Sequence, residues 1–184
     1  MSPADAAALR GLLQKRSIRH GDFVLASGQR STYYIDCRLS TMSAEGMRLI
    51  GRLGWDAIRE AGWRPRAIGG LTMGADPVAY AVAGASWGSE LVLDAFSIRK
   101  EAKGHGLGRL IEGNFAAGEP VVIAEDVITS GGSARRAIDA VRDATGEVLG
   151  VLAVVDREQG GRAAIEALGV PVVALTTSTA LGLA

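Results

Sequence analysis

The chain has 184 residues, of which 48% are hydrophobic, enough apolar surface for one compact domain with a substantial core. Twenty basic and twenty acidic residues leave no formal net charge, so no global field marks the chain as a nucleic-acid or membrane binder. A single cysteine excludes an internal disulfide. Because the sequence has no long apolar run and no signal-like N-terminus, we expect one cytoplasmic domain over 1–184.

The predicted elements alternate between helices and strands along the chain. Ser2 and Pro3 favour the start of a first helix that reaches about Lys15, and a second helix over 44–61 should end near Gly62. Buried strands are expected at 67–71, 91–98, 121–124, 148–155 and 170–175, and further helices at 75–85, 134–144 and 162–168. This alternation predicts an α/β fold with a mainly parallel central sheet flanked by helices.

The most specific motif, over 121–133, runs from an apolar strand through two acids into a turn rich in hydroxyl groups and glycine. The turn 129–133 would lie at the start of the following helix, where free backbone N–H groups and the helix dipole favour an anion. Gly131 and Gly132 permit close backbone approaches there, which predicts a phosphate site. For the glycines alone, an ordinary strand, turn and capped helix is the alternative. A Walker loop is excluded because no GKS or GKT triplet occurs.

The adjacent acids Glu125 and Asp126 would repel a phosphate unless they face hydrogen-bond donors, such as ribose hydroxyls, or a developing positive charge. The complete stretch resembles the signature of the type I phosphoribosyltransferases, which bind phosphoribosyl pyrophosphate. The resemblance implies that both acids are catalytic and hold the ribose hydroxyls, while the turn surrounds the 5-phosphate. The implied binding residues are Glu125, Asp126, Val127, Ile128, Thr129, Ser130, Gly131, Gly132 and Ser133.

A second cluster, over 96–108, places four cationic residues among glycines. Its composition suits a lid that closes over a polyanion, although a solvated basic loop is the alternative. The order Arg-Lys, Lys, His resembles the catalytic loop of the orotate phosphoribosyltransferases, which implies pyrophosphate contacts from Arg99, Lys100, Lys103 and His105. The resemblance also implies a catalytic role for Lys103 and a homodimer in which the 99–108 loop acts in the neighbouring subunit's site.

The segment 23–36 resembles the orotate-side motif of the same family. The resemblance implies that Ser27, Tyr33 and Tyr34 contact the base, since a tyrosine ring can stack on a flat heteroaromatic acid. Many family members carry a lysine before the Ser-Gly pair, whereas this chain has Ala26. A plain hairpin with tyrosines packed against its core is the alternative.

Two turns after predicted strands complete the match. The turn after 67–71 resembles a pyrophosphate-binding loop and implies contacts from Thr72, Met73 and Gly74, with Met73 where other branches have lysine. Arg157 lies where the family places an arginine on the orotate carboxylate, which a guanidinium grips with paired hydrogen bonds. A surface ion pair is the alternative for Arg157. Thr129 is implied to lie between the phosphate turn and orotate.

Together the motifs cover about 23–157, and they imply a type I phosphoribosyltransferase fold with a small hood-like subregion from about 1–40 and the C-terminal end. The implied reaction transfers the ribosyl 5-phosphate group to orotate, giving orotidine 5-monophosphate and pyrophosphate, in de novo pyrimidine (UMP) biosynthesis. The reaction would use Mg²⁺ that is held mainly by substrate oxygens, and no direct protein ligand of the metal is assigned. Neither nucleic acid nor a membrane is expected as a partner. A purine or uracil phosphoribosyltransferase and a non-catalytic regulator that senses phosphoribosyl pyrophosphate are the alternatives.

Overall fold

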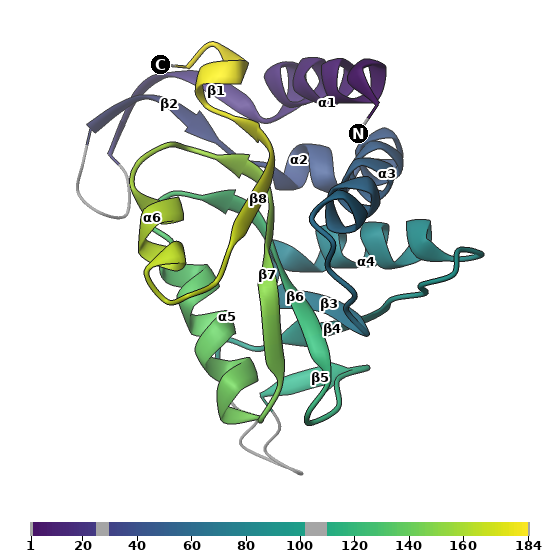
Figure 1. Ribbon diagram of the computed structural model, residues 1–184. Coiled ribbons are helices and arrows are strands. Elements are labelled where there is room, and N and C mark those ends of the chain that lie inside the picture. Colours follow the sequence, from purple (N-terminus) through teal and green to yellow (C-terminus); the bar gives the residue numbers. More distant parts are fainter. Residues whose placement is uncertain (1, 25–29, 102–109, 184) are drawn as a thin grey trace.

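A computed structural model of the protein describes residues 2–24, 30–101 and 110–183 (Figure 1). Its elements in chain order are α1 (Pro3–Arg16), β1 (Ile18–Val24), β2 (Arg30–Ile35), α2 (Arg38–Thr41), α3 (Ala44–Glu60), β3 (Ala67–Leu71), α4 (Ala75–Ser86), β4 (Asp94–Ile98), β5 (Ile111–Gly113), β6 (Pro120–Ile128), α5 (Gly132–Asp143), β7 (Glu147–Asp156), α6 (Gly161–Glu166), β8 (Val172–Thr177) and the 3-10 helix η1 (Thr179–Leu181). Within these residues, no helix has the length and apolar character needed to cross a membrane.

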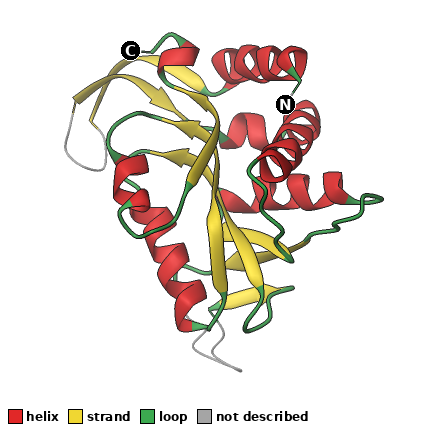
Figure 2. Ribbon diagram, in the orientation of Figure 1, coloured by secondary structure: helices red, strands yellow, loops and turns green. Residues whose placement is uncertain are grey.

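Six strands form the central sheet in the order β5-β4-β3-β6-β7-β8. All neighbouring pairs are parallel except β4 and β5, and β1 and β2 form a separate antiparallel hairpin. Figure 2 shows the sheet running through the molecule between two groups of helices. The predicted α/β architecture with a mainly parallel sheet is therefore confirmed.

Helices α3 and α4 cover one face of the sheet, and α5 and α6 cover the other (Figure 1). The apolar face of α3, with Leu49, Leu53 and Ile58, is fully buried in one hydrophobic cluster, because these residues recur at helical spacing. A second cluster on the opposite face contains Ile138 and Val141 of α5. The sheet is thus held between two apolar layers, which makes its strand ends a rigid support for the loops that follow them.

The direction in which successive strands are added to the sheet changes at β3. From β3 it continues to β4 on one side, and it later returns to β6 on the other side of β3. In open α/β sheets, a crevice for ligands forms at such a switch point, beyond the carboxyl ends of the strands. The turn after β3 and the turn after β6 therefore flank the same crevice.

Several predicted boundaries were wrong, and strand pairing explains the differences at three strands. The strand expected over 121–124 continues to Ile128, because β7 supplies partners as far as Asp156. The strand expected from 91 begins at Asp94, where its pairing with β3 starts. The last strand covers 172–177 rather than 170–175, in register with β7. The elements α2, β5 and η1, of four residues or fewer, are too short to produce a periodic pattern.

Candidate functional site

A cavity of about 760 Å³ lies at the crevice between β3 and β6. It brings together side chains from β2, from the turns after β3 and β6, from the end of β4 and from the loop after β7. The predicted site residues that line it are Tyr34, Thr72, Met73, Gly74, Lys100, Glu125, Asp126, Val127, Thr129, Ser130, Ser133 and Arg157. Residues that are distant in the sequence therefore meet in one cavity, as the motifs predict.

The turn after β6 adjoins a smaller pocket of about 100 Å³, which is lined by Val127, Ile128, Thr129, Ser130, Gly131, Gly132 and Ser133 among others. Gly131 has a φ of 80°, and a Cβ there would lie 2.8 Å from the Gly161 carbonyl oxygen. Unlike α1 and α3, which are capped by Ser2 and Ser43, α5 has no side-chain cap. The first N–H groups of α5 are therefore available to an anion.

The two acids lie within β6, not after it, and Glu125 is only 5% exposed. Burial raises the pKa of the Glu125 carboxyl to about 8, the charge of Asp126 adds to the rise, and Arg136 opposes it. Burial also raises the pKa of Asp126, although its Oδ1 accepts a hydrogen bond of 2.9 Å from the Val127 N–H. Within the described part of the chain, Glu125 Oε1 has no hydrogen-bond partner. A ligand whose hydroxyl groups donate hydrogen bonds would supply the missing partner.

We expect Glu125→Gln to flatten the pH dependence of the free energy of unfolding. Folded Glu125 keeps its proton up to about pH 8, whereas an unfolded glutamate loses it near pH ~4.5, so the folded state binds more protons in between. Wild-type stability should therefore fall as the pH rises through this window, by an amount on the order of 2–4 kcal/mol that the neutral amide removes. Urea denaturation at pH 5, 6.5 and 8 measures the difference.

The matched control for this experiment is Glu147→Gln, at the exposed start of β7. Its unfolding free energy should follow the wild-type pH dependence. If wild type and Glu125→Gln lose stability in parallel between pH 5 and 8, the raised pKa of Glu125 would be contradicted.

The turn after β3 packs directly on the second acid. A Cβ added to Gly74 would lie 2.7 Å from Asp126 Oδ1, so glycine is required for this close approach. The peptide between Thr72 and Met73 is cis, and Met73 is 59% exposed at the cavity wall. The turn after β3 therefore approaches the end of β6 closely at Asp126.

Arg157 occupies the other end of the cavity. Its guanidinium carbon lies 4.8 Å from the centroid of the Tyr33 ring, and its Nη2 donates to Ser31 Oγ at 3.4 Å. Arg157 is 6% exposed, and no described residue accepts a hydrogen bond from its Nε. A buried guanidinium with an unsatisfied donor favours an anionic acceptor, such as a carboxylate.

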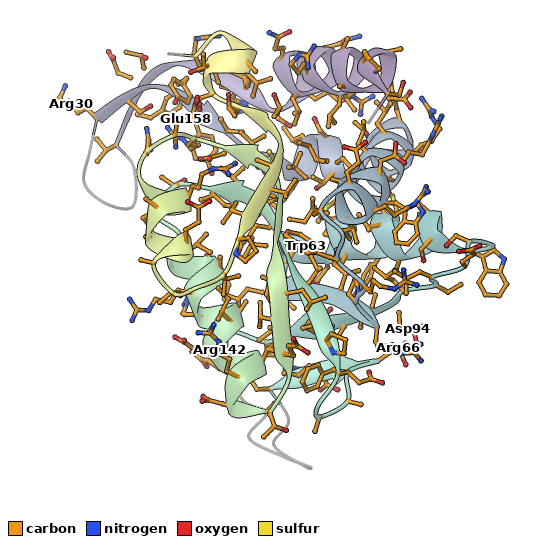
Figure 3. The ribbon with its side chains drawn as sticks, viewed as in Figure 1. Arg30, Trp63, Arg66, Asp94, Arg142 and Glu158 are labelled. Atoms are coloured by element: carbon orange, nitrogen blue, oxygen red, sulfur yellow. The ribbon has the colours of Figure 1, made fainter. Side chains whose placement is uncertain are left out.

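The two tyrosines of the hairpin differ in position. Tyr34 lines the cavity and is 41% exposed, whereas Tyr33 is buried, does not line the cavity and supports Arg157 from behind. The Tyr33 hydroxyl lies 3.5 Å from Ser178 Oγ, which connects the hairpin to the C-terminal end. Glu158, beside Arg157, lies close to this hairpin in Figure 3, at the end of the molecule opposite Arg142.

The cationic segment is only partly described. Lys100 lines the cavity, but the Arg99 Nε donates to Glu112 Oε1 at 3.1 Å and Arg99 is not among the lining residues. Lys103, His105 and Ser27 lie outside the described residues. Across 2–24, 30–101 and 110–183, no three His, Cys, Asp or Glu side chains gather as potential ligands of a metal ion.

Sequence reasoning missed four polar residues of the cavity wall: Asp36, Arg38, Arg136 and Gln159. Arg38 donates from Nε and Nη2 to the Asp36 carboxylate at 2.8 and 2.9 Å, and this pairing lowers the pKa of Asp36. A signal for this pair was present, because Asp36 is the last residue of the 23–36 hairpin motif and Arg38 follows it by two residues. Arg136 follows Ser133 by three residues, the spacing of one helix face.

No family model matches the chain. It is 43% identical over 183 residues to the orotate phosphoribosyltransferase of Rhodopirellula baltica, covering 97% of this chain and 95% of that protein. It is 46% identical over 170 residues to the orotate phosphoribosyltransferase of Aquifex aeolicus, covering 91% and 92%.

A solved structure agrees with these relatives. The structure of the Mycobacterium tuberculosis orotate phosphoribosyltransferase in complex with 5-phospho-alpha-D-ribosyl 1-diphosphate matches with a TM-score of 0.82 and 38% identity. The match covers 97% of this chain and 99% of that one. The chain therefore belongs to the orotate phosphoribosyltransferase family and has its type I phosphoribosyltransferase fold.

Proposed function

We propose that this protein transfers the ribosyl 5-phosphate group from phosphoribosyl pyrophosphate to orotate, giving orotidine 5-monophosphate and pyrophosphate. The observation that carries the proposal is a pair of unsatisfied buried groups in one cavity, the acceptor Glu125 Oε1 and the donor Arg157 Nε. Ribose hydroxyls would satisfy the first and the orotate carboxylate the second. Each buried group left unpaired costs about 1–3 kcal/mol, so the free cavity favours a ligand with both features.

The ribosyl phosphate would occupy the β6 side of the cavity. The 129–133 turn and the uncapped start of α5 would bind the 5-phosphate, and Glu125 and Asp126 would accept hydrogen bonds from the ribose hydroxyls. As the bond from the anomeric carbon to pyrophosphate breaks, positive charge grows on the sugar. The Asp126 carboxylate would stabilise that charge. The same positive charge would lower the pKa of Glu125 from the value of about 8 in the free protein, so Glu125 would ionise more readily in the transition state than in the bound substrate.

Pyrophosphate would occupy the side formed by the turn after β3. Thr72, Met73 and Gly74 offer backbone groups there, and Lys100 adds a positive charge at the same cavity. Lys103 and His105 would complete the contacts, with Lys103 assisting the departing oxygen by charge or proton donation. Lys103, His105 and Arg99 would make these contacts in the site of a second subunit, because the 99–108 loop is proposed to act in trans, and the present pairing of Arg99 with Glu112 outside the cavity wall fits this arrangement.

Orotate would lie at the end of the cavity formed by the hairpin and the loop after β7. Arg157 would bind its carboxylate, Tyr34 would contact the ring, and Thr129 would lie between orotate and the phosphate turn. Tyr33 would act through Arg157 by holding the guanidinium, and Ser27 would add a base contact. We propose that about 1–40 and the C-terminal end form a hood over this base within one domain, which the Tyr33–Ser178 contact supports.

The donor set suits Mg²⁺ that is bound chiefly through substrate oxygens. Two adjacent carboxylates face the cavity, and the described residues hold no cluster of three ligating side chains. Mg²⁺ usually keeps several waters and binds one or two carboxylates together with substrate phosphates. When bound, it would supply charge neutralisation to the leaving pyrophosphate. Asp126 and Glu125 would orient the ribose hydroxyls next to it.

The decisive experiment follows orotate absorbance with purified protein, Mg²⁺ and phosphoribosyl pyrophosphate. Adenine, hypoxanthine, guanine and uracil are tested in parallel by pyrophosphate release. Turnover of orotate alone supports the proposal, and turnover of another base would refute the assignment of Arg157 and Tyr34 to orotate. Binding of phosphoribosyl pyrophosphate without turnover of any base would favour a regulator.

We expect Gly74→Ala to lower kcat/KM for phosphoribosyl pyrophosphate by about 10- to 100-fold, because small displacements of catalytic groups have effects of this size. The added Cβ would displace the Asp126 carboxylate, from which it would lie 2.7 Å away. Steady-state kinetics at saturating orotate measures the loss. Gly84→Ala, within the helix that Gly74 precedes as the N-cap residue, has no atom within 4 Å of its new Cβ and should keep wild-type kinetics. Equal kinetics for the two variants would contradict the role of the close approach.

A further inference from the structure

Among the described residues, four cationic side chains line the large cavity: Arg38, Lys100, Arg136 and Arg157. Two of them are engaged by the protein. Arg38 forms two hydrogen bonds with the Asp36 carboxylate, and Arg157 stacks on a tyrosine at the base end. Lys100 belongs to the cationic loop segment. Arg136 is the remaining cation of this set: it belongs to no motif, and no described side chain pairs with it, so its position at the cavity needs another explanation.

Arg136 lies on the second turn of α5, on the face that carries Ser133. Ser133 lines both the large cavity and the smaller pocket of the phosphate turn, so this face of α5 adjoins both. Long side chains on a helix lean toward its N-terminus, which for Arg136 is the direction of the 129–133 turn. Its guanidinium is also close enough to Glu125 for its charge to oppose the rise in the pKa of that carboxyl.

The preceding residue provides an internal comparison. The Nε of Arg135 lies 4.0 Å from Oδ2 of Asp139 on the next turn of α5, and Arg135 does not line the cavity. Arg136 has no hydrogen-bond or ion-pair partner within the part of the chain that the structure describes, and its side chain is exposed at the cavity. Two adjacent arginines of one helix thus differ: one is paired on the surface, and the other faces the site with its donors free.

We propose that Arg136 is a substrate-binding residue that donates hydrogen bonds to the 5-phosphate of phosphoribosyl pyrophosphate from the α5 side, beside the 129–133 turn. This inference rests on the proposed function. A helix N-terminus offers only partial positive charge, whereas a phosphate monoester carries close to two negative charges at neutral pH. A guanidinium supplies a full charge and paired donors that match phosphate oxygens.

The local charge balance favours this assignment. The bound sugar phosphate would lie beside Glu125 and Asp126, so its phosphate adds negative charge to a region that already holds two carboxyl groups. Met73 brings no charge to the opposite turn. Arg136, next to Glu125 and on the same helix as the phosphate turn, is placed to offset both the carboxylate and the phosphate.

The test compares Arg136→Ala, Arg136→Lys and Arg135→Ala by calorimetric titration with ribose 5-phosphate, pyrophosphate and phosphoribosyl pyrophosphate. Arg136→Ala should weaken binding of ribose 5-phosphate and of phosphoribosyl pyrophosphate about tenfold, the size expected for one exposed charge-assisted contact. Pyrophosphate affinity and the KM for orotate should stay at wild-type values. Arg136→Lys should recover part of the loss, and Arg135→Ala should bind all three ligands like wild type.

Equal ribose 5-phosphate affinity in Arg136→Ala and Arg135→Ala would overturn the assignment, as would a loss confined to pyrophosphate. Both arginines are exposed, so neither variant removes buried packing, and matched thermal unfolding confirms that both fold. The outcome is separate from that of the proposed reaction. A selective loss of ribose 5-phosphate binding supports Arg136 even if no base is turned over, and equal binding refutes it even in an active enzyme.

Discussion

Arg157→Ala should lower kcat/KM for orotate by about 100-fold or more, since removal of one partner from a buried charged pair costs about 2–5 kcal/mol. Arg157 is 6% exposed, and its Nε has no acceptor among the described residues, so the substrate carboxylate would supply that acceptor. Affinity for phosphoribosyl pyrophosphate should change little, because Arg157 does not line the smaller pocket at the 129–133 turn, where the 5-phosphate is proposed to bind. Steady-state kinetics and a separate binding titration measure the two effects.

The conservative variant Arg157→Lys should recover little activity. An ammonium cannot donate two parallel hydrogen bonds to a carboxylate or stack flat on the Tyr33 ring. Arg142→Ala is the matched control, because Arg142 is exposed at the far end of α5 and, among the described residues, donates only to the Leu168 carbonyl (Figure 3). If Arg157→Ala lost phosphoribosyl pyrophosphate binding and kept its orotate KM, the base end of the cavity would be misassigned.

Lys103→Ala should lower kcat by about 100- to 1,000-fold, the effect of removing one positioned donor at a developing charge. Lys103 lies outside the described residues, so its role is a prediction from the resemblance of its loop. The thermal unfolding temperature should stay near that of wild type, because the substitution removes a substrate contact. A variant with near-normal turnover would remove Lys103 from the mechanism.

A mixing experiment tests whether the 99–108 loop acts in a partner subunit. In the proposed homodimer, Lys103→Ala chains alone and Asp126→Ala chains alone should each have little activity. In a hybrid dimer, one site combines an intact Asp126 with an intact loop from the other chain, so mixing should restore part of the activity. Subunit exchange that is demonstrated by tagged chains but brings no recovery would count against the arrangement in trans and leave the individual roles intact.

Much of the fold could be predicted from local patterns. The spacing of Ile50, Leu53 and Ile58 predicted α3, and the apolar run at 67–71 coincides with β3, because burial on one helical face or in a central strand selects such patterns. The 129–133 turn could be singled out as a candidate phosphate site for a similar reason. Its glycines and hydroxyl groups meet a conformational and chemical requirement within a few consecutive residues, as the φ of 80° at Gly131 illustrates.

By itself the sequence determined the alternation of the longer helices and strands, the mainly parallel sheet and the motifs that meet in the cavity. Only the tertiary structure decided that Tyr34 lines the cavity while Tyr33 supports Arg157, and that Asp36 holds Arg38. It also placed Arg136 near Glu125, where the positive charge of Arg136 opposes the rise in the pKa of that carboxyl. Alternation along a strand says that neighbouring side chains face opposite sides. Which side is buried, and how strongly a charge is desolvated there, depends on residues that β7, α5 and the C-terminal end bring from elsewhere in the chain.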